Sequence, residues 1–191
     1  FEQPGDVWTA PSGAANGVAG VRIDGGRVLE GKGALRVDLA LPGEATVQRD
    51  FFRDLTRHRT LTVNLYAETG APADLRALVF LQDGEWLWYQ SPLYPLPSGK
   101  WTRLALDVRP ESPVWQNAGH PQPWSRRSAA TVKRIGVKFF SASAWRGPVF
   151  IDEISGGAGG FPDYSVGARE VPVYGRTEIT FFLPETAANP F

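Results

Sequence analysis

Aromatic and amide side chains are concentrated in the segment DGEWLWYQSPLYPL, residues 83–96. A strand here would put Trp86, Trp88 and Gln90 on one face, because successive side chains of a strand point to opposite faces. Such a face combines flat aromatic rings, which pack against C–H groups, with amides that donate and accept hydrogen bonds. These groups suit a polyhydroxylated ligand such as a sugar, so the three residues are candidate ligand-binding residues.

The orientation of the two tryptophans depends on the hairpin turn before them. A three-residue turn at residues 83–85 would pair Gln82 with Trp86 and leave both rings on a mixed face of aromatics and amides. A turn one residue shorter would pair Leu81 with Trp86, and both rings would then face aliphatic core residues. The sequence leaves both registers open.

Polar residues inside other strand-like runs are further candidates for hydrogen bonds to ligand hydroxyl groups. The same residues also fit ordinary solvent-facing positions of a strand. The candidates are Arg36, Gln48, Asn64 and Lys138.

A long proline-rich connection, residues 109–125, separates two strand-like runs. A connection of this length is uncommon in a compact domain unless it packs on itself or serves a site. Its Trp115 and Trp124 are therefore candidate ligand-binding residues of an edge loop. Two other tryptophans, Trp8 and Trp101, are expected to be structural.

No catalytic motif accompanies these residues. The chain has two histidines, His58 and His120, and neither lies in a pattern typical of nucleophilic or metal-dependent hydrolysis. Carboxylates such as Asp83 and Glu85 are expected to be solvated, since carboxylate pairs occur in any chain of this composition. The sequence therefore favours a binding domain over an enzyme.

Charge and composition argue against several classes of partner. The 191 residues include 20 Lys plus Arg and 20 Asp plus Glu, so neither nucleic acid nor an anionic membrane is an expected partner. No apolar run approaches the roughly 20 residues of a membrane span. The absence of cysteine excludes a disulfide framework and thiolate metal sites.

Short β-strands must position the candidate residues. Eight apolar runs alternate with period two between Gly- and Pro-rich turns, which predicts an antiparallel all-β sandwich or barrel. One short helix is expected over residues 128–134. A glycine-rich patch at residues 156–160 predicts a domain of residues 1–157. Residues 158–191 would then be a linker and the first strand of a following, truncated module.

Several segments, in their order along the chain, resemble a known family. FEQPGDVW, LEGKGALRVDLAL, LTVNLYAETG, GKWTRLALDV and WRGPVFIDEI follow one another over residues 1–155. They resemble the galactose-binding-like jelly-roll domains that serve as carbohydrate-binding modules beside glycoside hydrolases. The resemblance implies a jelly-roll β-sandwich that binds a polysaccharide or oligosaccharide without cleaving it. It also implies a secreted or cell-surface protein with an attached catalytic domain.

The same resemblance keeps a second function open. Some members of the superfamily bind no sugar and act as spacers or docking domains of a multidomain glycosidase. The two functions differ in whether Trp86 and Trp88 are exposed side by side. The closing segment, RTEITFFLPETAANPF, resembles the first strand of the small sandwich that precedes the catalytic barrel of some glycosidases, so the chain is expected to be the N-terminal part of a larger enzyme.

The family further implies a structural calcium ion where the first and last strands meet. Calcium takes about 6 to 8 oxygen ligands from carboxylates and carbonyls. Glu2 and Asp152 match the family's positions, and the backbone carbonyl of Lys32 would add a ligand. Calcium is therefore the expected cofactor.

Overall fold

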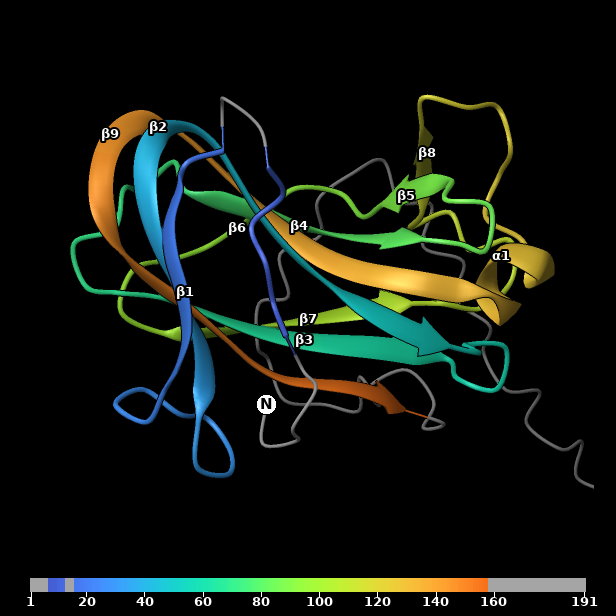
Figure 1. Cartoon of the computed structure of the whole chain (residues 1–191), viewed down its shortest axis with the longest axis horizontal. Helices are drawn as coiled ribbons and strands as arrows, with labels where there is room; N and C mark the ends of the chain where they lie inside the picture. Colours follow the sequence, from blue (N-terminus) through green and yellow to red (C-terminus); the bar gives the residue numbers. More distant parts are fainter. Residues whose placement is uncertain (1–6, 13–15, 158–191) are drawn as a thin grey trace, which may run out of the picture.

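The computed structural model describes residues 7–12 and 16–157, which form a two-layered β-sandwich (Figure 1). The elements are β1 (Val18–Asp24), β2 (Ala34–Arg53), β3 (Thr60–Ala67), β4 (Arg76–Gln82), β5 (Trp88–Gln90), β6 (Tyr94–Pro95), β7 (Trp101–Asp107), β8 (Gln116–Ala118), α1 (Arg126–Ala130) and β9 (Val132–Gly157). All strand pairs between these elements are antiparallel. The predicted jelly-roll β-sandwich is confirmed.

Two long strands, β2 and β9, belong to both layers. They pair with each other over nearly their whole length, with a break in register between Leu41 and Gly43. A break of this kind bends a strand, and both strands curve sharply at this point in Figure 1. Each strand therefore contributes one half to each layer.

The two layers have different partners for these halves. The first layer contains β1, the N-terminal half of β2, the C-terminal half of β9, β3 and β7. The second layer contains the other halves of β2 and β9, followed by β4, β5 and β8. Its register sets Gln48 opposite Gly136, Gly136 opposite Phe80, and Phe80 opposite Gln90. These four side-chain positions therefore share one face of the second layer.

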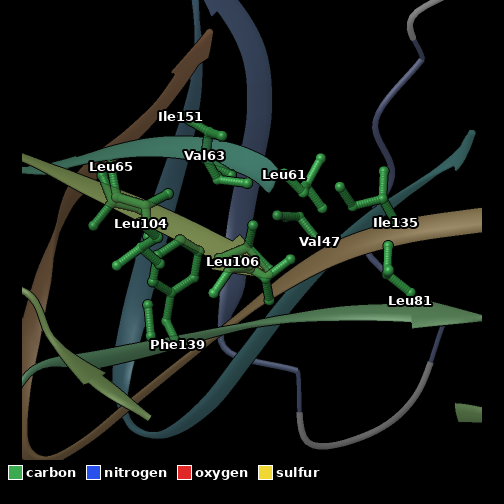
Figure 2. Close-up of a cluster of buried hydrophobic side chains, with 14 of the residues drawn as sticks. Val47, Leu61, Val63, Leu65, Leu81, Leu104, Leu106, Ile135, Phe139 and Ile151 are labelled. Atoms are coloured by element: carbon green, nitrogen blue, oxygen red, sulfur yellow. The ribbon is translucent and has the colours of Figure 1, made fainter. Parts of the chain in front are cut away.

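The hydrophobic core fills the space between the layers (Figure 2). Val63 on β3 and Leu106 on β7 project toward Val47, Leu81 and Ile135 of the second layer, and all five are at most 1% exposed. Burying a side chain of this size contributes about 1.5–3 kcal/mol. This packing fixes which residues of each strand point inward, and so which residues point outward.

The predicted strands are present, but several have different limits. The predicted runs at residues 34–41 and 46–52 join into β2, and those at residues 134–140 and 148–154 join into β9. They join because the chain bends between layers without leaving the hydrogen-bonded sheet. Strands β1, β6 and β8 were not predicted. A bulge after Val18 interrupts β1, and β6 and β8 have only two and three residues, too few to show alternation.

The helix prediction was wrong by several residues. Helix α1 begins at Arg126 and ends at Ala130, after which Val132 opens β9. Its N-cap is Ser125, whose side chain accepts a hydrogen bond from the backbone N–H of Ser128. Within the described ranges, no helix has the length and hydropathy needed to cross a membrane.

Candidate functional site

A groove opens on the outer face of the second layer. Its volume is about 450 Å³, which is within the range of small-molecule sites. Strands β2, β9, β4 and β5 supply its floor and one side, and the segment before β1 supplies the other side. It is lined by Pro11, Ser12, Asn16, Glu44, Thr46, Gln48, Gln82, Trp88, Arg134 and Lys138.

The floor of the groove is a stack of rings over a glycine. A Cβ atom at Gly136 would lie 2.2 Å from the Phe80 ring, so this ring lies directly over the glycine. Trp88 stacks on Phe80, with ring centroids 3.8 Å apart and ring planes at 14°. Phe80 is fully buried and Trp88 is half-buried. Trp88 is therefore the aromatic surface that the groove presents.

The hairpin between β4 and β5 places Trp88 on the outer face. Gln82 pairs with Trp88, so the loop spans residues 83–87 and is two residues longer than the longer predicted turn. Lengthening the loop by two residues leaves each strand residue on the same face, because side chains alternate with period two. Trp88 and Gln90 therefore share a face with Gln82, as the three-residue turn predicted, whereas Trp86 lies in the loop.

Two ion pairs stand along the groove. The guanidinium of Arg134 lies 3.2 Å from Asp50 Oδ1 and donates a hydrogen bond of 3.3 Å to Gln82 Oε1. The ammonium of Lys138 lies 2.7 Å from Glu44 Oε2. In both pairs the cation is mostly buried and the carboxylate is exposed. These four groups together add no net charge to the groove.

The segment before β1 forms the wall opposite Trp88. The Asn16 side chain pairs with the backbone of Thr46 as a neighbouring strand would. Its side-chain oxygen accepts from the Thr46 N–H at 2.8 Å, and its amide donates to the Thr46 carbonyl at 3.0 Å. Thr9 exchanges two backbone hydrogen bonds with Gln48, at 2.8 and 2.9 Å. The wall is thus fixed to the edge of β2.

Aromatic residues pack against Tyr89 on the inner side of β5. Tyr89 is fully buried, and its ring packs edge-on against His120 and Trp124 with centroids 5.0 and 5.2 Å away. Its hydroxyl bonds with the Ser128 hydroxyl at 2.9 Å, and burial raises the pKa of Tyr89. His120 Nε2 donates to the carbonyl oxygen of Trp88 at 2.9 Å. These contacts fix the strand that carries the Trp88 ring.

Trp115 and Trp124 are not on an open surface, and their burial does not support the role predicted for them as ligand-binding residues. Trp115 is 4% exposed and Trp124 is 1% exposed. Their indole N–H groups donate to the backbone carbonyls of Asp107 and Arg109, at 2.8 and 3.1 Å. The long connection packs on itself, and its tryptophans support β5 rather than a ligand.

Arg36 and Asn64 lie in the first layer, away from the groove, and their role in ligand binding stays a prediction. Asn64 is 3% exposed and donates to the Glu153 carboxylate at 3.2 Å. Arg36 forms ion pairs with Asp24 and Asp38 at 3.6 and 2.9 Å. The bend of β2 separates Arg36 from the groove, because only the C-terminal half of that strand reaches the second layer.

The structural roles expected for two tryptophans are confirmed. Trp8 is 6% exposed and belongs to the main core. Trp101 packs on Tyr66 with ring centroids 5.5 Å apart, beside Phe150, in a second cluster on the outer face of the first layer. Arg27 covers this cluster, with its guanidinium 4.6 Å from the Tyr66 ring centroid.

Among the described residues around Asp152, no group of three or more acidic or histidine side chains is placed to hold a calcium ion. Asp152 is 3% exposed, and one of its oxygens accepts hydrogen bonds from the backbone N–H groups of Leu29 and Glu30, at 2.8 and 3.2 Å. These two backbone N–H groups occupy positions around the Asp152 oxygen that a bound cation would take. Glu2 lies outside the described residues, as do residues 158–191 of the expected second module. Calcium held with the Lys32 carbonyl stays a prediction that rests on the resemblance.

Sequence reasoning named part of the groove and missed the rest. It named Trp88, Lys138 and Gln48, which the structure brings together with Gln82, and it named Gln90, which bonds to the Trp88 indole. It missed Arg134, Glu44 and Asn16. The alternation of RIGVKFF could have indicated Arg134, which shares a strand face with Lys138. No local signal marks Asn16, because its role depends on the edge of a distant strand.

The groove offers the chemistry of a neutral, polyhydroxylated ligand. The Trp88 ring provides a flat surface for C–H groups, and the amides of Gln48 and Gln82 can donate and accept hydrogen bonds. Among the described residues, no group of three or more His, Asp and Glu side chains is placed to hold a metal ion. The aromatic ring and the amides are therefore groups that suit the binding of such a ligand.

Sequence comparison finds no match, either among protein-family models or among curated proteins. The fold, in contrast, is shared with solved carbohydrate-binding modules. The family 11 module from Clostridium thermocellum, solved with a β-1,3-1,4-mixed-linked tetrasaccharide, has a TM-score of 0.56 at 12% identity, covering 81% of this chain and 89% of that chain. The CBM27-1 module of Caldicellulosiruptor saccharolyticus, solved with mannohexaose, has a TM-score of 0.52 at 13% identity, covering 77% and 87%.

A catalytic protein also contains this fold. An exo-β-agarase matches with a TM-score of 0.52 at 11% identity, and the match covers 82% of this chain but 24% of the agarase. The chain therefore has the β-sandwich fold of carbohydrate-binding modules, a fold that also occurs as a minor part of a longer glycosidase.

Proposed function

We propose that this chain is a non-catalytic carbohydrate-binding module whose groove binds a glycan. The observation that carries the proposal is the Trp88 ring, which is stacked on Phe80 and half-buried in a groove lined by amides and paired ions. A fixed aromatic surface loses little conformational freedom on binding, and the amides beside it match sugar hydroxyl groups. The shared fold of modules solved with oligosaccharides supports the same function.

The paired charges favour an uncharged glycan. Arg134 and Lys138 already hold Asp50 and Glu44, whose carboxylates are the more exposed members of each pair. An acidic sugar would have to approach these carboxylates before it could reach either cation. We therefore expect neutral glucans, mannans, xylans or galactans to bind better than polyuronates.

Affinity electrophoresis against these neutral polysaccharides tests the proposal, with isothermal titration for any that retards the protein. Trp88→Ala should reduce the affinity at least tenfold, because the ring supplies the stacking surface. Trp101→Phe is the matched control, since Trp101 is a half-buried tryptophan on the outer face of the other layer. Circular dichroism must show that both variants are folded.

The result also separates binding from the alternative function. A folded protein that no polysaccharide retards, and whose behaviour Trp88→Ala leaves unchanged, would be a spacer or docking domain. Within the proposal the module is secreted or displayed at the cell surface and keeps an attached glycoside hydrolase near its substrate. The agarase whose chain contains this fold supports that arrangement.

A further inference from the structure

Trp86 is an exposed aromatic side chain in a strained backbone position. It is 48% exposed, and its φ is +65°. A bulky residue in this left-handed region is an outlier, because its backbone conformation is energetically unfavourable. Such a conformation persists only where surrounding contacts impose it, and it is concentrated at functional sites.

The loop that carries Trp86 is held by several hydrogen bonds. Asp83 is 4% exposed, and its side chain accepts from the backbone N–H groups of Glu85 and Leu87 at 2.9 and 3.0 Å. The backbone N–H of Trp86 donates to the Asp83 carbonyl at 3.0 Å, and Lys133 donates to the Gly84 carbonyl at 2.7 Å. The backbone that carries the ring is therefore preorganised, which lowers the entropic cost of using the ring in binding.

Arg134 connects this ring to the groove. Its guanidinium lies 4.7 Å from the centroid of the Trp86 ring and also lines the groove, where Gln82 and Asp50 fix it. Lys138 lines the groove four residues further along the same strand, a distance of about 13 Å. The groove thus runs from the Lys138 end to the Arg134 end, and Trp86 continues it beyond Arg134.

We infer that Trp86 is a second stacking position, which a glycan reaches only when the chain is long enough to pass Arg134. This inference rests on the proposed function of the groove. The affinity of the module then depends on the length of the glycan, because Trp88 contacts every ligand in the groove, whereas Trp86 contacts only extended chains. An aromatic contact of this kind contributes about 0.5–1.5 kcal/mol, which corresponds to a twofold to tenfold change in affinity.

Titration of disaccharides and hexasaccharides of the glucan, mannan, xylan and galactan series tests this inference. In the parent protein, the hexasaccharide that binds should bind more tightly than its disaccharide. Trp86→Ala should weaken hexasaccharide binding twofold to tenfold and leave disaccharide binding unchanged. Ile23→Ala is the matched control, because Ile23 is 49% exposed on β1 in the other layer. This control should change neither affinity.

The possible outcomes separate this inference from the function on which it rests. An equal loss for both lengths in Trp86→Ala, or a loss for neither, would overturn the second stacking position while the groove stays a binding site. Absence of binding by any oligosaccharide to the folded parent protein would overturn the proposed function itself. Loss of hexasaccharide affinity alone, with an unchanged melting temperature, supports the inference.

Discussion

Gly136 is the residue on which the aromatic floor of the groove depends. The Phe80 ring occupies the space that a side chain at this position would need, and the carbonyl oxygen of Val47 lies 2.6 Å from the same Cβ position. Trp88 in turn stacks on Phe80. The absence of a side chain at Gly136 thus leaves room for the Phe80 ring, on which the Trp88 ring stacks.

Gly136→Ala should therefore damage both stability and binding. The added methyl group must displace the Phe80 ring, which costs about 1–3 kcal/mol of the free energy of unfolding and tilts the Trp88 ring above it. Urea unfolding and titration with the bound polysaccharide measure the two effects. Gly20→Ala is the control, since the nearest atom to its Cβ, a side-chain oxygen of Asp38, is 3.4 Å away. Full affinity and stability in Gly136→Ala would contradict the stacked floor.

Strand β5 depends on the long connection behind it. Residues 109–125 contribute no ring to the ligand surface, yet Trp124 packs against Tyr89, whose strand neighbour Trp88 forms that surface. Trp115 and Trp124 pack on each other with ring centroids 5.4 Å apart. A strand of three residues such as β5 is not stable by itself. The packing of the connection against β5 therefore keeps this strand in its orientation.

Trp124→Ala should lower the free energy of unfolding by about 3–5 kcal/mol, because it removes a fully buried indole and leaves a cavity. Trp88→Ala should lower the free energy of unfolding by clearly less than Trp124→Ala, since Trp88 is only half-buried. Urea-unfolding curves followed by circular dichroism compare the two variants directly. If Trp124→Ala lowered the free energy of unfolding by less than about 1 kcal/mol, the packing of the connection would not be what stabilises β5.

At the scale of the whole molecule, carboxylates join segments that are distant in sequence. Asp74, before β4, accepts from the Ser141 hydroxyl and the backbone N–H of Ala142, both at 2.8 Å, at the bend of β9. The Ser141 hydrogen bond is the main cause that lowers the pKa of Asp74.

At Asp38, burial would raise the pKa, but hydrogen bonds from Arg36 and Arg22 outweigh it and lower the pKa.

Stability should therefore decrease in acid. A carboxyl group whose pKa is lower in the folded state stabilises the fold above its unfolded pKa of about 3.9, and this contribution is lost as the pH falls through the folded value. The melting temperature should begin to fall near pH 5 and continue to fall below pH 4. Asp74→Asn should melt at a lower temperature than the parent at pH 7, and the two should converge at pH 2–3. A constant difference across this range would contradict the role of Asp74.

The sequence by itself determined the fold class and the aromatic and amide character of the candidate surface. Period-two alternation predicts a β-sandwich because one side of each strand must be buried between the layers. The aromatic and amide residues of the segment at residues 83–96 indicated where to look, and parity alone kept Trp88 and Gln90 on one face. A resemblance carried by five short segments extended this prediction to a family of binding modules.

Only the tertiary structure decided which candidates meet. Arg36 and Lys138 both lie in alternating strands, and the bend of β2 sends Arg36 to the other layer. Trp115 and Trp88 are both tryptophans near turns, and only packing places one inside the core and the other in the groove. Local pattern sets the face on which a side chain lies, whereas the proximity of two faces depends on pairings between strands tens of residues apart. For that reason the two tryptophans that follow Asp83 have different positions: Trp88 lies in the groove, and Trp86 lies in the loop before β5.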